Sequence, residues 1–281
     1  MRRITSYLKW LLDYGYTLLL VGGISLRVGG RFFRWRILLW LHYIRNVEST
    51  QTYMKQTLLI IRHGQTTWNV EHRLPGQLPG VPLNDNGRQQ AARLADALAV
   101  LPISAIISSP LERARETADF IAKGRNLTIQ LEPDLMDTNI GPWAGQVIED
   151  LTKNDPAWKE YVKDPTLAPE GIETFPQVQQ RSIGAIERWR KQEHIGAYPA
   201  FVAHADVVKL VIAHYTGLEA KRAGSLFIDN ASVSIVEIGE EEHQFHVLSI
   251  GWSPRPGWLK PPVSVPTQNN ERVQEAGEQK T

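Results

Sequence analysis

The sequence predicts an α/β protein, a three-layer α/β/α sandwich with a mostly parallel central sheet. Short apolar, β-branched runs alternate with amphipathic helical segments through the middle of the chain, which is the pattern of strands joined by crossover helices. Two of these runs, at 57–61 and 200–203, lead into a histidine. Since ligands of open α/β sheets bind at the carboxyl ends of the strands, both histidines are expected at a binding edge.

The first half of this region is predicted to contain three strands and two helices. Thr57–Ile61 is a run of apolar and β-branched residues, as expected of a buried strand. Asp85–Val100 repeats apolar residues at helical spacing, and the polar residues at its start are helix-start signals. Ala105–Ile107 is a short strand, Pro110–Lys123 a helix with proline in its first turn, and Leu127–Leu131 alternates as a strand.

The second half is predicted to begin with a long helix and to end in a hairpin. Phe175–Gln192 is amphipathic at helical spacing. The strand Ala200–Ala203 leads directly into a helix at Asp206–Tyr215. Ser232–Ile238 and Gln244–Ile250 are separated by a Gly-Glu-Glu-Glu-His turn and form the terminal hairpin.

Charge is distributed unevenly along the 281 residues. The chain carries 31 Lys+Arg and 30 Asp+Glu, a net charge of +1. Residues 1–50 carry +6 and residues 51–281 carry −5. The near-neutral total gives no bulk signal for nucleic-acid binding, and we expect no nucleic-acid partner. With no cysteine, the chain has no disulfide framework, cysteine nucleophile or thiolate metal site.

We therefore expect three regions: a basic, apolar segment at 1–56, one domain at 57–253 and a disordered tail at 254–281. The longest uncharged run of the first region, Tyr14–Leu26, has 13 residues, whereas a spanning helix needs about 20. Residues 1–50 are then either a peripheral contact with anionic lipid or a stretch foreign to the natural protein. The tail has few large apolar residues and is rich in proline and polar residues.

The strongest chemical signal is Arg62-His63-Gly64, which directly follows the first strand. The strand end delivers the imidazole of His63 to the edge of the sheet. Arg62 can bind phosphoryl oxygens bidentately. Gly64 permits a sharp turn and leaves space for an anion beside the ring. Gln65-Thr-Thr-Trp-Asn69 follows and makes a chance match of three residues improbable.

Two further blocks place polar residues where a strand meets a helix. In Ser108-Ser-Pro-Leu-Glu-Arg113, the arginine lies at a helix N-terminus, a natural anion site. Arg115, two residues later, is expected to be a solvated surface charge. In Phe201-Val-Ala-His204-Ala-Asp206, the aspartate either caps the following helix or orients His204.

Together these blocks resemble the histidine phosphatase superfamily, with its phosphoglycerate mutase-like fold, from Thr57 to about Ile250. The resemblance implies that His63 is the nucleophile and becomes transiently phosphorylated. It implies that Arg62, Arg113 and Asn69 bind the phosphate, and that His204 donates a hydrogen bond to it. The alternative, in which His63 is only a buried structural residue, does not explain the residues from Arg62 to Asn69 that surround it.

The resemblance also implies a proton donor for the leaving alcohol. Family members carry Leu-x-Glu before a Gly-x-Trp-x-Gly loop, whereas this chain reads Leu135-Met-Asp137 before Gly141-Pro-Trp-Ala-Gly145. Asp137 therefore stands where the family has glutamate, one methylene shorter. Glu173 resembles the glutamate of the family's Gly-Glu-Ser/Thr segment, and we expect it at the start of the long helix.

We therefore expect a metal-independent phosphatase that hydrolyses a small phosphorylated metabolite without a cofactor. Its expected location is the cytoplasm, with membrane association through the first segment as one of the two alternatives for residues 1–50. Two alternatives remain open: a phosphoglycerate mutase, and a catalytically idle protein that binds phosphorylated ligands. The segment Leu135–Phe175 has three lysines and no arginine, which favours hydrolysis over the mutase, because the family's mutases carry adjacent arginines in this region. The substrate and the oligomeric state do not follow from the sequence.

Overall fold

A computed structural model describes residues 55–239 and 244–256 of the chain. The segment at 1–50 with its expected lipid contact lies outside these residues, as do most of the expected tail and most of the turn within the terminal hairpin. Among the helices of the described residues, none is both long enough and apolar enough to cross a membrane.

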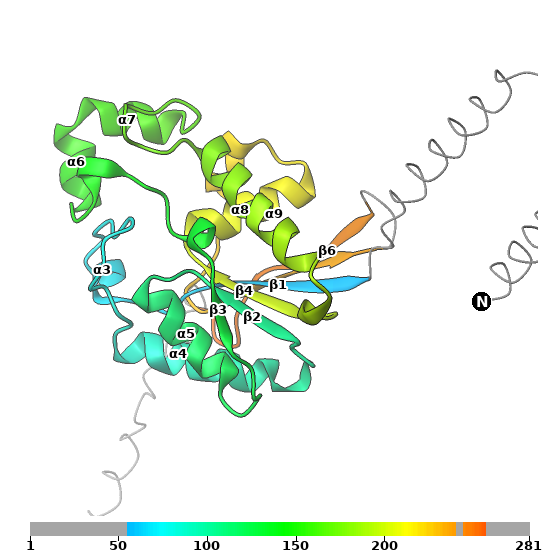
Figure 1. Cartoon of the computed structure of the whole chain (residues 1–281). Helices are drawn as coiled ribbons and strands as arrows, with labels where there is room; N and C mark the ends of the chain where they lie inside the picture. Colours follow the sequence, from blue (N-terminus) through cyan, green and yellow to red (C-terminus); the bar gives the residue numbers. More distant parts are fainter. Residues whose placement is uncertain (1–54, 240–243, 257–281) are drawn as a thin grey trace, which may run out of the picture. The chain divides into compact units, whose positions relative to one another are not determined.

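The described residues form a six-stranded sheet in the order β3-β2-β4-β1-β5-β6 (Figure 1). The strands are β1 (Gln56–Arg62), β2 (Ala105–Ser108), β3 (Ile129–Leu131), β4 (Pro199–Ala203), β5 (Val233–Ile238) and β6 (Phe245–Trp252). Strands β3, β2, β4 and β1 are mutually parallel, and β5 is antiparallel to both of its neighbours. The mostly parallel sheet predicted from the sequence is confirmed.

Helices cover both faces of this sheet (Figure 1). The helices are α3 (Thr67–Val70), α4 (Asp85–Ala97), α5 (Glu112–Ala122), α6 (Ile148–Asn154), α7 (Pro156–Lys163), α8 (Phe175–Arg190) and α9 (Ala205–Thr216). On β1, Leu58 and Ile60 pack toward α8 and α9, whereas Leu59 and Ile61 pack toward α4 and α5. This alternation is the period of a strand buried on both faces, and it produces the predicted three layers.

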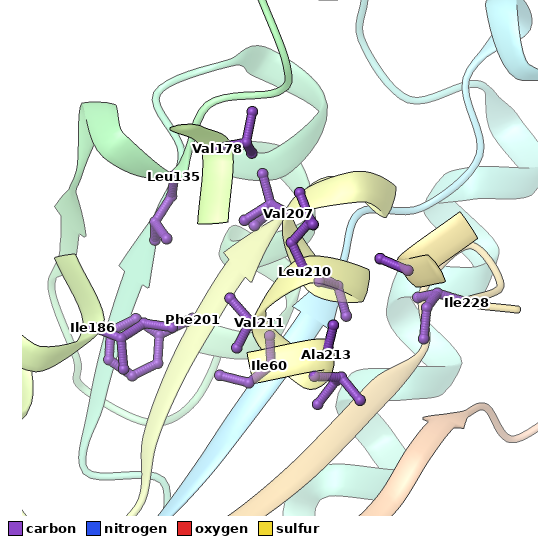
Figure 2. Close-up of a cluster of buried hydrophobic side chains, with 14 of the residues drawn as sticks. Ile60, Leu135, Val178, Ile186, Phe201, Val207, Leu210, Val211, Ala213 and Ile228 are labelled. Atoms are coloured by element: carbon purple, nitrogen blue, oxygen red, sulfur yellow. The ribbon is translucent and has the colours of Figure 1, made fainter. Parts of the chain in front are cut away.

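The core under α8 and α9 holds most of the large buried side chains (Figure 2). Phe201 of β4, Val211 of α9 and Ile186 of α8 are fully buried there. Burying a side chain of this size contributes about 1.5–3 kcal/mol. The two strands that lead into the histidines are therefore held rigidly from both sides.

Helix boundaries differ from the sequence prediction at specific turns. The helix expected from Pro110 begins at Glu112, because the backbone N–H of Leu111 donates to Ser109 Oγ and closes a turn before the helix. Helix α4 ends at Ala97 and continues as a 3₁₀ turn to Val100. Helices α3, α6 and α7 were not predicted, since segments of four to eight residues show little periodicity.

Gly64 packs directly against the start of α4, a contact that the sequence did not predict. A Cβ at Gly64 would lie 2.6 Å from the carbonyl oxygen of Gly87. A Cβ at Gly87 would lie 2.0 Å from the carbonyl oxygen of Gln65. The two glycines therefore permit a backbone-to-backbone contact, and the nearest obstacle to a side chain at Gly64 is this helix.

Candidate active site

His63 lies at the end of β1 and is 2% exposed. Its backbone N–H donates to the Ala203 carbonyl at 3.0 Å, which continues the pairing of β1 with β4. Its Nδ1 is 2.7 Å from the Gly64 carbonyl oxygen. A carbonyl only accepts, so Nδ1 carries the ring proton and Nε2 keeps its lone pair. Burial, with Arg113 and Arg62 nearby, holds the pKa of His63 well below its ordinary value, so the imidazole is neutral.

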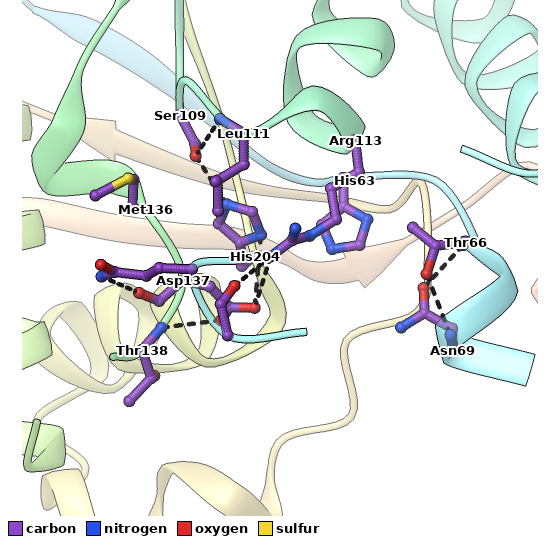
Figure 3. Close-up of polar contacts among 12 residues, drawn as sticks. His63, Thr66, Asn69, Ser109, Leu111, Arg113, Met136, Asp137, Thr138 and His204 are labelled. Carbon is purple, nitrogen blue, oxygen red and sulfur yellow. Dashed lines mark hydrogen bonds and ion pairs between the residues drawn. The ribbon is translucent and has the colours of Figure 1, made fainter. Parts of the chain in front are cut away.

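His204 is fully buried at the end of the neighbouring parallel strand β4. Its ring centroid lies 5.1 Å from that of His63 (Figure 3). Its Nε2 is 2.8 Å from Ser109 Oγ, and its Nδ1 has no hydrogen-bond partner among the described residues. Burial, followed by the charge of Arg113, holds the pKa of His204 well below its ordinary value. The β1–β4 pairing thus brings together two histidines that are 141 positions apart in the sequence.

Arg113 is fully buried in the first turn of α5. Its Nη2 donates to the Gly76 carbonyl at 2.8 Å and to Asp137 Oδ2 at 3.1 Å. Its Nε and Nη1 are buried without a hydrogen-bond partner in the described part of the chain. Arg62 donates from Nη1 to the Ile228 carbonyl, and its Nε is likewise buried without a partner there. Buried charged donors left unpaired are costly, so these atoms mark an anion site.

Asp137 lies in the loop before the 3₁₀ turn 141–143 and points toward Arg113 and His204 (Figure 3). Its Oδ1 accepts from the Thr138 backbone N–H, and its Oδ2 is 3.7 Å from His204 Nδ1. Burial raises the pKa of Asp137, and the nearby Arg113 opposes this shift. A carboxyl with a raised pKa, next to the anion-binding side chains, is a suitable proton donor.

An arginine that the sequence did not single out holds the backbone of this loop. Arg181 of α8 donates to the carbonyl oxygens of Asp134, Met136 and Asp137 at 2.6, 2.8 and 3.0 Å. It also pairs with Glu173, at 2.7 and 2.9 Å. Glu173 precedes the Thr174 N-cap of α8, so its role is to fix Arg181 rather than to start the helix. Helical periodicity shows only that Arg181 lies on the long helix and carries no signal for this contact.

Asn69 lines the cavity next to His63, and its side-chain oxygen is already engaged. Its Oδ1 accepts from the Thr66 backbone N–H at 3.0 Å and from Asn230 Nδ2 at 3.3 Å. Asn230 also donates to the His63 carbonyl at 3.3 Å. The sequence did not point to Asn230. It reaches the site because β5 is antiparallel, which brings the loop before β5 to the edge where β1 and β4 end.

Two other charged residues considered from the sequence, Arg115 and Asp206, have structural roles. Arg115 is exposed on α5. Asp206 lies in the first turn of α9, whose N-cap position is His204 itself, so the aspartate does not act as the N-cap. Its carboxylate contacts Lys209 at 3.5 Å and lines the cavity. Asp206 therefore stabilises α9 through its negative charge near the positive end of the helix dipole.

A cavity of about 490 Å³ opens over His63. Arg62 and Asp137 line it, together with side chains of α3, α6 and the loop before β5. Among the described residues, no group of three or more His, Asp or Glu side chains could hold a metal ion. The cavity therefore brings side chains at the end of β1 together with side chains from separate helices and loops.

Comparison with known proteins gives a consistent family. The sequence model of the histidine phosphatase superfamily (branch 1) matches residues 58–251. A probable phosphoglycerate mutase GpmB of Shigella boydii is 33% identical over 196 residues, which cover 69% of this chain and 88% of that protein.

Solved structures show the same similarity. YhfR of Bacillus stearothermophilus is 33% identical with a TM-score of 0.64, covering 70% of this chain and 96% of that one. A mycobacterial glucosyl-3-phosphoglycerate phosphatase, solved with VO3, is 29% identical with a TM-score of 0.59, covering 64% and 92%. A putative α-ribazole-5'-P phosphatase of Escherichia coli is 27% identical with a TM-score of 0.63, covering 70% and 96%.

Proposed function

The chain belongs to the histidine phosphatase superfamily (branch 1), and on this premise we propose that it hydrolyses a small phosphomonoester through a phosphohistidine at His63. One observation carries the proposal. Buried nitrogens of Arg62, Arg113 and His204 have no partner among the described residues and surround a neutral imidazole whose Nε2 keeps its lone pair. That combination offers a nucleophile and the donors that a phosphoryl group needs.

In the first step, Nε2 of His63 attacks phosphorus in line with the leaving oxygen. The P–N bond forms as the P–O bond breaks, and the Asp137 carboxyl donates its proton to the leaving alkoxide. Arg62, Arg113 and His204 balance the charge on the other phosphoryl oxygens. The two guanidinium groups supply the positive charge that a metal ion supplies in other phosphotransfer enzymes, so we propose a metal-independent reaction.

In the second step, a water molecule attacks phosphorus and gives a proton to the Asp137 carboxylate. The P–N bond breaks, and its electron pair returns to Nε2 of His63. Inorganic phosphate leaves, and Asp137 is again protonated. Each group therefore returns to its starting state after one turnover.

A phosphoglycerate mutase remains the second candidate, because relatives of this chain carry that name. Hydrolysis is favoured by the placement of two lysines of the segment 135–175. Lys153 pairs with Glu149, and Lys163 lies 3.7 Å from Glu160, with all four side chains mostly exposed. Neither lysine lines the cavity, so neither is placed to hold the carboxylate of a phosphoglycerate.

The test uses the full chain with p-nitrophenyl phosphate, and with 3-phosphoglycerate in the presence and absence of its bisphosphate primer. Release of free phosphate supports hydrolysis, whereas isomerisation without free phosphate supports the mutase. Binding of phosphate without turnover of any substrate supports the idle binder.

The nucleophile is tested on the same substrates. We expect His63→Ala to lower kcat by on the order of 10³-fold or more and to abolish an acid-labile phosphoenzyme. His214→Ala, at an exposed histidine of α9, is the matched control. Near-native turnover by His63→Ala contradicts the assignment.

A further inference from the structure

We infer that the leaving alcohol of the substrate has a neutral, apolar or aromatic body, bound by Trp68, Ile148 and Phe227 in the cavity over His63. The inference rests on the proposed function and narrows it to a class of phosphomonoester. The three side chains come from α3, the start of α6 and the loop before β5, and all line the cavity that contains His63.

The exposure of these side chains is the first line of support. Phe227 is 63% exposed and Ile148 is 37% exposed. Large apolar side chains that converge from separate elements on one cavity are typical of a ligand-binding wall. Neither is needed to fill the core, since the fully buried side chains of β1, β4 and α9 already do so.

The charges of the same wall are the second line of support. Asp206 and Asp229 line the cavity, and both lie close enough to Arg62 for their charges to raise its pKa against the lowering effect of burial. Both carboxylates disfavour a second anionic group on the substrate, such as the carboxylate of a phosphoglycerate. They accept hydrogen bonds from hydroxyl groups, which a neutral alcohol can supply.

A further cation of the cavity lining, Arg73, is already engaged by the protein. Arg73 donates to the Gly145 carbonyl at 2.7 Å and to Glu71 at 3.3 Å. Its guanidinium carbon lies 5.5 Å from the centroid of the Trp68 ring. Arg73 therefore serves to hold Trp68 in the wall, where the ring can contact the substrate body.

The experiment compares three alkyl monoesters on the full chain: 3-phenylpropyl phosphate, propyl phosphate and 3-phosphoglycerate. The first two leave as primary alcohols of similar acidity, so their difference reports binding of the phenyl group. We expect kcat/KM for 3-phenylpropyl phosphate to exceed that for propyl phosphate by about tenfold or more. For 3-phosphoglycerate, kcat/KM should not exceed that of propyl phosphate.

Variants of the wall identify the residues responsible. Phe227→Ala and Ile148→Ala should each reduce the phenylpropyl-to-propyl ratio of kcat/KM by about threefold or more. The matched control is Leu248→Ala on β6, since Leu248 is 59% exposed and does not line the cavity. This control should leave both activities unchanged. If Phe227→Ala leaves the phenylpropyl-to-propyl ratio of kcat/KM as unchanged as Leu248→Ala does, Phe227 does not bind the substrate body, and the inference is overturned.

The outcomes separate this inference from the proposed function. Hydrolysis of propyl phosphate without a preference for the phenyl compound overturns the inference and leaves the phosphatase proposal standing. If no monoester is hydrolysed, the phosphatase proposal fails, and the inference is decided by calorimetry of the two alkyl phosphates. A lower Kd for 3-phenylpropyl phosphate then supports it, and equal Kd values overturn it.

Discussion

Each of the two buried imidazoles has one ring nitrogen hydrogen-bonded to the protein. For His63 the acceptor is a carbonyl, which places the proton on Nδ1. For His204 the partner is Ser109 Oγ, which itself accepts from the Leu111 backbone N–H. We assign the Ser109 hydroxyl hydrogen to His204 Nε2, which leaves the ring proton on Nδ1, the nitrogen nearest the Asp137 carboxyl. In the proposed reaction, these contacts prepare the His63 ring to attack and the His204 ring to donate.

The role of Ser109 predicts a specific loss. Ser109→Ala should lower kcat by about fivefold, because losing one hydrogen bond of about 1 kcal/mol frees the ring of His204 to take the other tautomer. Ser109→Thr should restore most of the rate. Ser182→Ala, at another fully buried serine, on α8, is the control and should keep kcat. Equal kcat values for Ser109→Ala and the unsubstituted protein contradict the tautomer assignment.

At the level of elements, the contact between the end of β1 and the start of α4 depends on two glycines. Gly87→Ala should reduce the free energy of unfolding by about 2 kcal/mol or more, because its Cβ would lie 2.0 Å from the Gln65 carbonyl oxygen. Gly184→Ala, on α8, meets only the end of the Arg188 side chain at 3.5 Å and should be neutral or stabilising by up to about 1 kcal/mol. Urea unfolding of both variants measures the difference. Equal effects would show that the close approach is not energetically important.

The link between α8 and the Asp137 loop predicts a combined effect on stability and rate. Arg181→Gln should cost about 3 kcal/mol of unfolding free energy, because Glu173 and three carbonyls lose a largely buried partner. It should also slow alkyl phosphates more than p-nitrophenyl phosphate, whose leaving group needs little help from Asp137. Arg188→Gln, in a half-exposed ion pair on the same helix, should cost less than about 1 kcal/mol and leave kcat unchanged. A uniform loss across substrates would indicate that Arg181 acts on stability alone.

Long elements with clear periodicity could be predicted from the sequence, and so could the side chains that directly follow strands. The ends of β1 and β4 fall close to the predicted positions, and His63, His204 and Arg113 lie together as expected. Arg181 and Asn230 could not be predicted, because their contacts depend on how α8 and the loop before β5 pack in three dimensions. The short helix α7 is held by ring contacts with Trp143, and Trp158 of α7 donates to Thr152 of α6, both tertiary effects with no local signal.

For the whole molecule, the two neutral histidines predict that stability falls in acid. In the unfolded chain both would titrate near about 6.5. In the folded protein, burial holds the pKa of His63 and of His204 well below that value. Below pH of about 6.5 only the unfolded chain takes up these protons, so each histidine removes about 1.4 kcal/mol per pH unit until its own folded pKa is reached. Above this range their contribution is constant.

Asp137 acts in the opposite direction within its own window. Burial raises the pKa of Asp137, so between about 3.9 and that raised value the folded protein binds a proton that the unfolded chain does not. Within that window, this proton offsets part of the histidine effect. Urea unfolding between pH 7.0 and 5.5 should therefore show a falling free energy, with a smaller slope in the double variant His63→Asn, His204→Asn. An unchanged slope in that variant would contradict the neutral histidines.

The backbone hydrogen bond from His63 to the Ala203 carbonyl has a consequence for engineering. This bond fixes the spacing of the His63 and His204 imidazoles through the register of β1 and β4. A slip of either strand by one residue would turn its ring to the other face of the sheet. The side chains that we infer to contact the alcohol lie instead on α3, on α6 and in the loop before β5, none of which sets that register. Grafting these segments between enzymes should therefore exchange substrate preference while the phosphorylation chemistry is retained.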